Sequence, residues 1–205
     1  GHVNPAVALA RIFQEREPDC KVLFVGADGG MENHLVPKEG YEIRSVTITN
    51  FHRSFAPADI AHNLGTVRNM VRSKQQAARI LDEFQPDLVV GTGGYASYPV
   101  VKEAARRHIP TAIHESNAVP GLTTKGLSKV VDRVMVGFEE SRSHYDHPEK
   151  VVVTGTPVRG DFFRYTRQEA REKLGLTDER PLLLSYWGSL GAEVMNRKMS
   201  EFIAR

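Results

Sequence analysis

Short apolar runs alternate with longer amphipathic stretches along most of this chain, and no other feature constrains the fold as strongly. The runs are rich in aliphatic and β-branched residues and stop at a glycine or a polar residue. We expect them to form strands at residues 21–26, 87–91, 110–114, 133–137, 151–154 and 182–185. Because the runs are continuously apolar rather than alternating, they are typical of strands covered on both faces, as in a parallel sheet.

Helix-length segments separate these runs. Helices are expected at residues 5–15, 57–84, 98–107 and 121–131. Strands that alternate with helices predict an α/β fold with a Rossmann-like, doubly wound parallel sheet. In such folds ligands bind at the carboxyl ends of the strands, so we expect the loops that follow the strands to carry the function.

Composition narrows the functional class. The 205 residues are 40% hydrophobic and 25% charged, as in ordinary globular proteins, and suffice for one domain or for one domain and part of another. A net charge of +2 is too small to indicate a nucleic-acid-binding protein. The single cysteine, Cys20, excludes a disulfide framework and a cysteine-based zinc site. No apolar run approaches the ~20 residues that a membrane span requires.

The domain boundary is expected near residues 157–160, where Pro-Val-Arg-Gly precedes a strongly charged segment. We assign residues 1–159 to a first domain. Residues 160–205 then supply a linker helix and the first strand and helix of a second Rossmann-like domain. Thr166, with Glu169 three positions later, predicts a capping box at the start of the linker helix.

Both ends of the chain contain a loop of the type that binds phosphate. Residues 185–192, Ser-Tyr-Trp-Gly-Ser-Leu-Gly-Ala, form a glycine-bearing turn between an expected strand and a helical pattern. Residues 1–5, Gly-His-Val-Asn-Pro, look like the end of a similar loop whose strand is missing. We therefore expect a piece of a longer protein, cut at both ends.

Three loops contain candidate functional side chains. His2 lies just before a helix N-terminus, where backbone amides favour an anion. Beside an anion such as a phosphate, His2 would act as a base or a hydrogen-bond donor. The sequence is equally consistent with His2 being an ordinary residue at the chain end. Residues 91–94, Gly-Thr-Gly-Gly, allow close backbone approach and are followed by Tyr95, although strand-helix packing alone would also explain the glycines.

Four polar residues, His-Glu-Ser-Asn at 114–117, follow the next strand, and packing does not explain them. His114 and Glu115 are candidates for an acid/base or orienting pair, although neighbours in a strand point to opposite faces. Asn117 would bind a hydroxyl or amide, or cap the following helix. No second histidine or carboxylate stands at a ligand spacing, so we expect no metal site.

Basic residues mark two further regions. Arg159, on a proline-stiffened turn at the expected domain boundary, suits a carboxylate, phosphate or carbonyl in a cleft, or is a plain surface residue. On the helix at 57–84, Arg68, Arg72 and Lys74 form a basic face that would rest on anionic lipid headgroups; a solvated helix face is the alternative.

Taken in order, the loops Gly-His-Val-Asn-Pro-Ala, Gly-Thr-Gly-Gly-Tyr, His-Glu-Ser-Asn, Gly-Thr-Pro-Val-Arg and Gly-Ser-Leu-Gly-Ala resemble those of the MurG family of glycosyltransferases, over nearly the whole chain. The resemblance implies a GT-B fold of two Rossmann-like domains. The first would hold the lipid I acceptor and dock on the anionic cytoplasmic face of the bacterial cell membrane as a peripheral protein. The second would hold UDP-N-acetylglucosamine (UDP-GlcNAc). The implied reaction is inverting transfer of N-acetylglucosamine to the 4-hydroxyl of lipid I, giving lipid II, without a cofactor.

The resemblance also implies roles for individual residues. Gly1 would be the last glycine of the first phosphate loop, and His2 a catalytic residue or a contact to the acceptor pyrophosphate. Catalytic positions on the acceptor side would be Tyr95, His114 and Glu115. Contacts to UDP-GlcNAc would come from Gly1, Asn117, Arg159 and Ser189.

This sequence departs from the family pattern at several positions. Trp187 and Leu190 stand where the family usually has Gly and Gln, which puts the role of Ser189 in doubt, and Ser116 and Thr156 replace a usual Gln and Asn. Because most of the second domain is absent, the fragment itself should be inactive. Two alternatives remain open: another GT-B sugar-nucleotide enzyme, such as a glycolipid synthase or an epimerase, and a non-catalytic α/β module that binds a membrane or a protein.

Overall fold

The computed structural model describes residues 2–48, 57–178, 180–186 and 192–204, without the side chains of residues 57–68 and 161. The chain divides into two compact units, Gly1–Phe162 and Phe163–Arg205.

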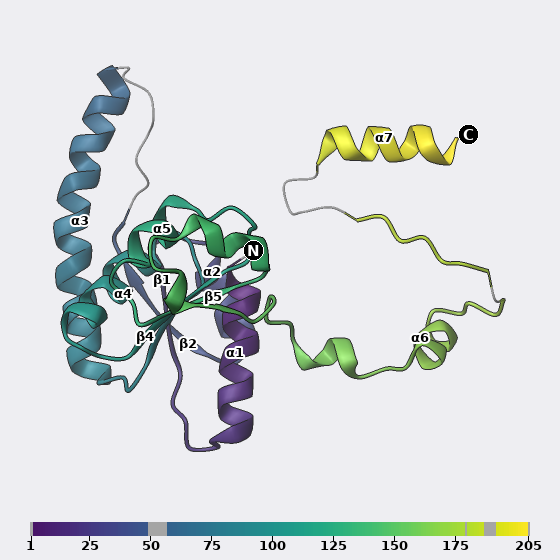
Figure 1. Cartoon of the computed structure of the whole chain (residues 1–205), viewed down its shortest axis with the longest axis horizontal. Coiled ribbons are helices and arrows are strands. Elements are labelled where there is room, and N and C mark those ends of the chain that lie inside the picture. Colours follow the sequence, from purple (N-terminus) through teal and green to yellow (C-terminus); the bar gives the residue numbers. More distant parts are fainter. Residues whose placement is uncertain (1, 49–56, 179, 187–191, 205) are drawn as a thin grey trace. The chain divides into compact units, whose positions relative to one another are not determined.

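The first unit alternates strands and helices (Figure 1). In chain order its main elements are α1 (Val3–Arg16), β1 (Leu23–Ala27), α2 (Glu32–Lys38), β2 (Glu42–Val46), α3 (Pro57–Phe84), β3 (Val89–Gly91), α4 (Ser97–Arg106), β4 (Thr111–Glu115), α5 (Leu122–Leu127), β5 (Arg133–Val136) and β6 (Val151–Val153). Short 3-10 helices occupy η1 (Glu139–His144), η2 (Pro148–Lys150) and η3 (Gly160–Phe163).

All strand pairs are parallel, which confirms the expected α/β class. The strands form two sheets, one of order β1-β2 and one of order β3-β4-β5-β6. Within the described residues no hydrogen-bonded ladder joins β1 to β3, so the outer edges of these two strands are unpaired.

Most expected elements are present, with small shifts at their ends. One expectation was wrong: residues 182–185 form no strand, and Leu182, Leu183 and Leu184 are exposed. A strand requires a neighbour to hydrogen-bond with, and these residues pair with none of the other described residues. Conversely, α2 and β2 were not expected; Pro37 lies inside α2, where a proline usually indicates a helix boundary.

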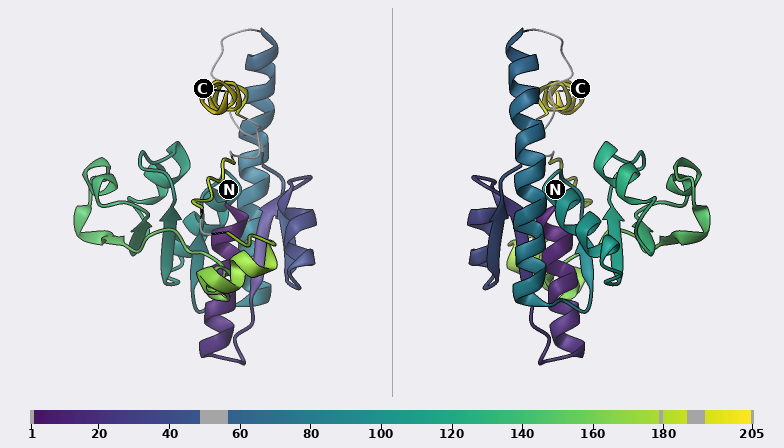
Figure 2. Two further views of the ribbon diagram at one scale, coloured as in Figure 1. Left: turned by 90° about the vertical axis from the view of Figure 1, so that its right-hand side faces the viewer. Right: turned by 90° about the vertical axis from the view of Figure 1, so that its left-hand side faces the viewer.

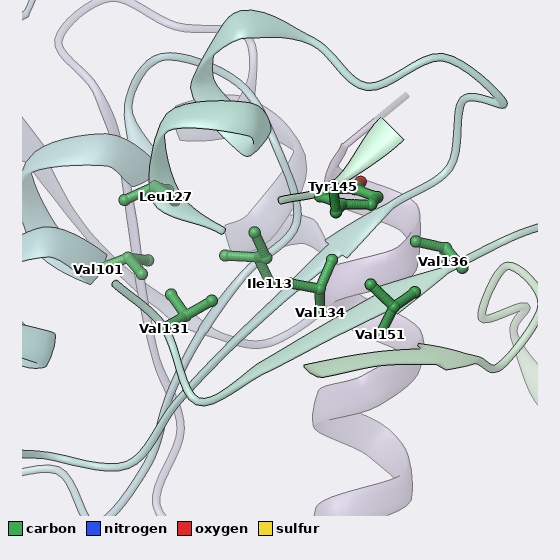
Figure 3. Packing of buried hydrophobic residues seen from close by; sticks show 8 residues of the cluster. All are labelled: Val101, Ile113, Leu127, Val131, Val134, Val136, Tyr145 and Val151. Carbon is green, nitrogen blue, oxygen red and sulfur yellow. The ribbon is translucent and has the colours of Figure 1, made fainter. Parts of the chain in front are cut away.

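Two apolar clusters hold the first unit together. One joins β2, α3 and α4 through Val46, Ala77, Ile80, Leu81, Val100 and Ala104. The other joins α4 and α5 to the four-stranded sheet through Val101, Ile113, Leu127, Val131, Val134, Val136, Tyr145 and Val151 (Figure 3). In Figure 1, α3 and α4 lie on one side of the strands and α1 on the other, and in Figure 2 the end of α3 at Pro57 extends beyond the strands.

The second unit contains α6 (Arg167–Lys173) and α7 (Glu193–Ile203), and neither helix has a buried residue. The expected capping box starts α6: the Glu169 backbone N–H donates to Thr166 Oγ1 at 3.3 Å, and the Thr166 N–H donates to Glu169 Oε2 at 2.7 Å. Local capping therefore defines this helix, while burial does not.

Candidate functional site

Polar loops gather at the carboxyl ends of the parallel strands in the first unit. His2 precedes α1, residues 92–96 join β3 to α4, and residues 116–121 join β4 to α5. Parallel strands end at the same edge of a sheet, so the fold brings together loops that are far apart in sequence.

His2 is held against the loop after β3 by two hydrogen bonds. Its Nδ1 lies 2.9 Å from the carbonyl oxygen of Thr92, and Thr92 Oγ1 donates to the His2 carbonyl at 2.8 Å. Because a carbonyl can only accept, Nδ1 carries the proton in this contact, and in the neutral imidazole Nε2 keeps its lone pair. The His2 side chain is exposed, so Nε2 is available to a substrate.

The glycines of this loop make room for the His2 ring. A Cβ at Gly93 would lie 2.6 Å from His2 Nδ1, and one at Gly94 would lie 3.5 Å from His2 Cδ2. Their φ angles of +97° and +74° also favour glycine. The histidine packed on the loop backbone therefore explains Gly93 and Gly94, whereas a Cβ at Gly91 would lie 3.0 Å from the Val101 side chain of α4, so this glycine serves strand-helix packing.

A cleft of about 900 Å³ lies beneath this contact, between β1 and β3. Its apolar walls come from α1, β1, β3 and α4, and His2, Thr92 and Gly93 lie at its rim. Glu32 also lines it, with Oε1 accepting a hydrogen bond from the Ala27 N–H at 2.8 Å.

Glu115 is buried at the end of β4, and its carboxylate accepts hydrogen bonds at both oxygens. Oε1 accepts from the Asn117 backbone N–H at 3.0 Å and from Asn117 Nδ2 at 2.8 Å, and Oε2 accepts from the Gly121 N–H at 3.1 Å. Burial by itself raises the pKa of Glu115, but these bonds and one from Thr124 outweigh it and leave the pKa below its usual value. The carboxylate is therefore ionised and fully engaged at neutral pH.

His114 is fully buried, and its ring contacts a different part of the chain. Its Nε2 lies 2.9 Å from the Gly155 carbonyl oxygen, and its Nδ1 lies 3.5 Å from Ser116 Oγ. Nε2 must carry the proton, because the carbonyl accepts. The structure does not bring the His114 and Glu115 side chains together as a pair; each has its own partners.

Tyr145 lies in the apolar cluster beneath these residues. Its side chain is buried, and its hydroxyl has no hydrogen-bond partner among the described residues. Burial, with the nearby Glu115 carboxylate, raises the pKa of Tyr145 to about 12. The Glu115 carboxylate thus takes its hydrogen bonds from the loop after β4 and from Thr124 of α5, and none from this hydroxyl.

The other expected site residues lie in several places. Tyr95 and Asn117 are exposed, in the loops after β3 and β4. Arg159 is part of the first unit, where its Nη1 forms an ion pair at 3.4 Å with Oε1 of Glu39, the residue that follows α2. Gly1 and Ser189 lie outside the described residues, as do Trp187 and Leu190.

Of the three basic residues expected at a membrane, Arg72 and Lys74 are exposed on α3, and the side chain of Arg68 is not described. Met70 and Val71, beside them, are 40% and 60% exposed. None of the described helices combines the length and the apolarity needed to cross a membrane.

Sequence reasoning missed the partners that hold these side chains. Thr92 fixes His2 across 90 positions, Gly155 fixes His114 across 41, and Glu39 pairs with Arg159 across 120. No local pattern indicates such long-range contacts. The Glu115–Asn117 contact spans two positions, so the turn itself was a usable signal.

Comparison with known proteins identifies the family. Residues 1–136 match the glycosyltransferase family 28 N-terminal domain. The chain is 41% identical, over all 205 residues, to the UDP-N-acetylglucosamine–N-acetylmuramyl-(pentapeptide) pyrophosphoryl-undecaprenol N-acetylglucosamine transferase of Acetivibrio thermocellus, covering 54% of that protein. A Thermoanaerobacter transferase of the same name is 44% identical over 203 residues, 99% of this chain and 55% of the relative. The chain thus spans about half the length of these relatives.

Solved structures agree on the fold. The crystal structure of MurG from Acinetobacter baumannii has a TM-score of 0.60 at 30% identity, covering 78% of this chain and 42% of that one. A UDP-GlcNAc 2-epimerase from Neisseria meningitidis has a TM-score of 0.59 at 13% identity, covering 98% of this chain and 59% of that one. At such low identity the second likeness concerns the fold alone.

Proposed function

This chain belongs to glycosyltransferase family 28, and we propose that it is the acceptor-side portion of an enzyme that transfers N-acetylglucosamine from UDP-GlcNAc to lipid I, giving lipid II. The observation that carries the proposal is the identity of 41% and 44%, across nearly the whole chain, to two proteins named for that reaction. The arrangement of His2 on the glycine loop supplies a chemical reason. We assign residues 1–159 to the acceptor domain and residues 160–205 to the start of the donor domain.

His2 is the proposed general base. In the reaction the oxygen of the acceptor 4-hydroxyl attacks the anomeric carbon of N-acetylglucosamine, the base takes the hydroxyl proton, and UDP leaves with the electrons of the broken bond. The Thr92 carbonyl fixes the proton on Nδ1 and leaves Nε2 free. A base positioned in this way contributes roughly 10²–10⁴-fold to a rate.

The start of α1 is the proposed site for the acceptor pyrophosphate. This 14-residue helix has no acidic residue in its first turn, and no side chain caps its N-terminus. Its first backbone N–H groups and its dipole therefore favour an anion. The glycine backbone at Gly93 and Gly94 lies against His2 at the same place, where it leaves the approach unobstructed by side chains. Tyr95, exposed just after these glycines, would contact the acceptor.

Glu115 and His114 support the reaction by holding other groups in place. The Glu115 carboxylate accepts hydrogen bonds from the loop that follows it and from Thr124 of α5, and both ring nitrogens of His114 face protein atoms. Asn117 Nδ2 donates a hydrogen bond to Glu115 Oε1, and this bond turns Asn117 Oδ1 away from the carboxylate. We therefore assign Asn117 to substrate contact and treat Glu115 and His114 as positioning residues.

On the donor side we retain Gly1, Asn117, Arg159 and Ser189 as contacts to UDP-GlcNAc. The ion pair with Glu39 holds the Arg159 side chain in the first unit, which would let it act as a fixed cation towards a diphosphate. Cofactor-free transfer is part of the same proposal, since backbone amides and arginine would stabilise the leaving UDP.

A hybrid enzyme tests this proposal. The 205 matching residues of the Acetivibrio thermocellus relative are replaced by this chain, so that the relative supplies the remainder. The hybrid should transfer labelled N-acetylglucosamine from UDP-GlcNAc to a lipid I analogue, with the unaltered relative as positive control. A hybrid that melts cooperatively but transfers nothing would contradict the proposal. A second hybrid that exchanges only residues 1–162 covers the case in which the first does not fold.

The same hybrid separates the alternatives. Sugar transfer to diacylglycerol would favour a glycolipid synthase, and an epimerised UDP sugar would favour an epimerase. The likeness to the solved epimerase is one of fold, at 13% identity, and gives no support for that activity. Binding to membranes or proteins with no reaction on any sugar nucleotide would favour a non-catalytic module.

Peripheral docking on the cytoplasmic face of the cell membrane is the second part of the proposal. Arg72 and Lys74 are exposed on α3 beside Met70 and Val71, and Arg68 lies on the same helix. Each basic residue near an anionic surface contributes about 1 kcal/mol, so the double variant Arg72→Ala, Lys74→Ala should bind phosphatidylglycerol vesicles about thirtyfold more weakly. The matched control, Lys21→Ala with Lys38→Ala, changes two exposed lysines elsewhere and should bind as the parent does. Equal binding by both pairs would remove α3 from the docking surface.

A further inference from the structure

The turn that follows β6 is held to the rest of the first unit at two points. At its start, the carbonyl oxygen of Gly155 lies 2.9 Å from Nε2 of the buried His114. Near its end, the Arg159 guanidinium reaches Glu39, which lies 120 positions earlier in the sequence. Pro157 stands between these two anchors, and its ring restricts the backbone there. The turn therefore presents Arg159 in a defined place.

The end of α2 fixes the position of Glu39. The Gly40 N–H donates to the Pro37 carbonyl at 3.0 Å, and Gly40 has a φ of +87°, a left-handed conformation that commonly ends a helix. The Tyr41 N–H donates to the Val36 carbonyl at 3.4 Å. Val36 is buried, so the helix end is anchored in the interior of the unit. The Glu39 backbone is therefore a firm base for its carboxylate.

Each oxygen of the Glu39 carboxylate contacts a different arginine. Oε2 accepts a hydrogen bond from Arg11 Nη2 on α1, and Oε1 pairs with Arg159 Nη1 at 3.4 Å. The Glu39 side chain is 25% exposed and the Arg159 side chain 36%, so water screens this pair less than it screens a fully exposed one. Two guanidinium groups and one carboxylate leave one net positive charge. The group as a whole therefore attracts a further anion.

The Arg159 guanidinium keeps donors available for that anion. An arginine side chain has five N–H donors. Among the described residues, Glu39 is the only one that accepts a hydrogen bond from the Arg159 side chain, and the bond uses Nη1. A side chain that is held in place before binding loses less conformational entropy when a ligand arrives. Glu39 thus orients the guanidinium and leaves its other N–H groups for a ligand.

We propose that Glu39 is a positioning residue for the donor substrate: it holds Arg159 so that the rest of the guanidinium meets the diphosphate of UDP-GlcNAc. This role rests on the proposed function, which assigns Arg159 to that contact. Glu39 acts through Arg159 and touches neither the donor nor the acceptor. Its effect is therefore on donor binding, while the chemical step is unaffected.

Steady-state kinetics of the hybrid enzyme test this role. Glu39→Gln keeps the shape of the side chain and removes its charge. KM for UDP-GlcNAc should rise about two- to fivefold, the range that a partly exposed ion pair supplies, while kcat and KM for the lipid I analogue stay as in the parent. The matched control Glu42→Gln removes an exposed carboxylate that pairs with Arg44 and should leave all three constants unchanged. An unchanged donor KM in Glu39→Gln, or an equal rise in both variants, would overturn the role.

A double-variant cycle shows whether Glu39 acts through Arg159. Arg159→Ala should raise the donor KM roughly tenfold or more, because a charged hydrogen-bond donor to the diphosphate is lost. Adding Glu39→Gln to Arg159→Ala should then raise the donor KM no further, because residues that act as one unit have non-additive effects. Two effects that simply multiply would overturn the positioning role.

Failure of this role can be told apart from failure of the proposed function. A parent hybrid that folds and transfers no sugar contradicts the proposed function, whereas normal transfer with an unchanged donor KM in Glu39→Gln contradicts the positioning role alone. The same cycle, measured by urea denaturation of the 205-residue chain, requires no activity. The effects of Glu39→Gln and Arg159→Ala on the free energy of unfolding should be non-additive. Additive effects would show that the pair is uncoupled and would overturn the role independently.

Discussion

The two polar clusters at the carboxyl ends of the strands differ in how many of their side-chain nitrogen and oxygen atoms already have a hydrogen-bond partner in the protein. At the His2 cluster one ring nitrogen is bonded to Thr92, and the exposed ring leaves the other available. At the cluster of His114 and Glu115, both side chains are buried and their polar atoms already have protein partners. A group that exchanges protons with a substrate requires a free lone pair within reach, so the open cluster suits chemistry and the closed cluster suits support.

The largest effect that this contrast predicts is at His2. His2→Ala in the hybrid enzyme should lower kcat by roughly 10²–10⁴-fold, because the proposed base is lost. The melting temperature should change little, since the side chain is exposed. Steady-state kinetics and a thermal melt on the same sample measure both quantities. A fall in kcat of less than tenfold would show that another group takes the proton.

His114→Ala should act on stability rather than on chemistry. It leaves a cavity and removes the donor to the Gly155 carbonyl, at a cost of about 2–4 kcal/mol in the free energy of unfolding. Urea denaturation of the 205-residue chain measures this cost, and His114→Gln should recover part of it. In the hybrid, kcat per folded molecule should stay within about tenfold of the parent. A much larger loss of kcat with unchanged stability would make His114 a catalytic residue instead.

Glu115→Gln should lower the free energy of unfolding by about 1–3 kcal/mol, because one oxygen that accepts hydrogen bonds becomes a donor. Its effect depends on pH. The folded pKa of Glu115 lies below its usual value, so its stabilisation is present above the unfolded pKa of about 4.3 and is lost as the pH falls through the folded pKa. Urea midpoints of the parent and the variant should therefore converge on acidification. In the hybrid, KM should rise as Asn117 loses its fixed orientation, while the pH profile of kcat keeps its shape. A shifted profile would identify Glu115 as the base.

Tyr145→Phe gives the smallest expected change. The Tyr145 hydroxyl is buried without a partner, so its removal should leave stability unchanged or raise it by up to about 1 kcal/mol at neutral pH. Because the pKa of Tyr145 is raised to about 12, its neutral form is favoured in the fold, and stability should fall as the pH rises from about 10 towards that value. The variant should lack this alkaline loss. A clear destabilisation at neutral pH would show that the hydroxyl supports Glu115 after all.

Periodicity and apolar runs were enough to predict the strands and helices of the first unit from β3 to β6. The apolar pattern of α3 and the strand-loop-helix order around Gly91 and Glu115 are local signals, and local signals survive in any tertiary context. The same reasoning failed at residues 182–185, which form no strand in the described part of the chain. It also missed α2 and β2, where Pro37 and an irregular polar pattern obscure the period.

The sequence by itself determined the α/β class, the family, and which loops carry polar side chains, because these depend on residues that are neighbours along the chain. Only the tertiary structure decided which of those side chains keeps a polar atom available to a substrate. Thr92 engages His2 from 90 positions away, and the Gly155 carbonyl engages His114 from 41 positions away. A side chain's chemistry depends on the hydrogen-bond partners that folding places beside it. Partners that are far apart along the chain produce no local pattern in the sequence. The unpaired edges of β1 and β3 are likewise visible only once the strands have been placed in their sheets.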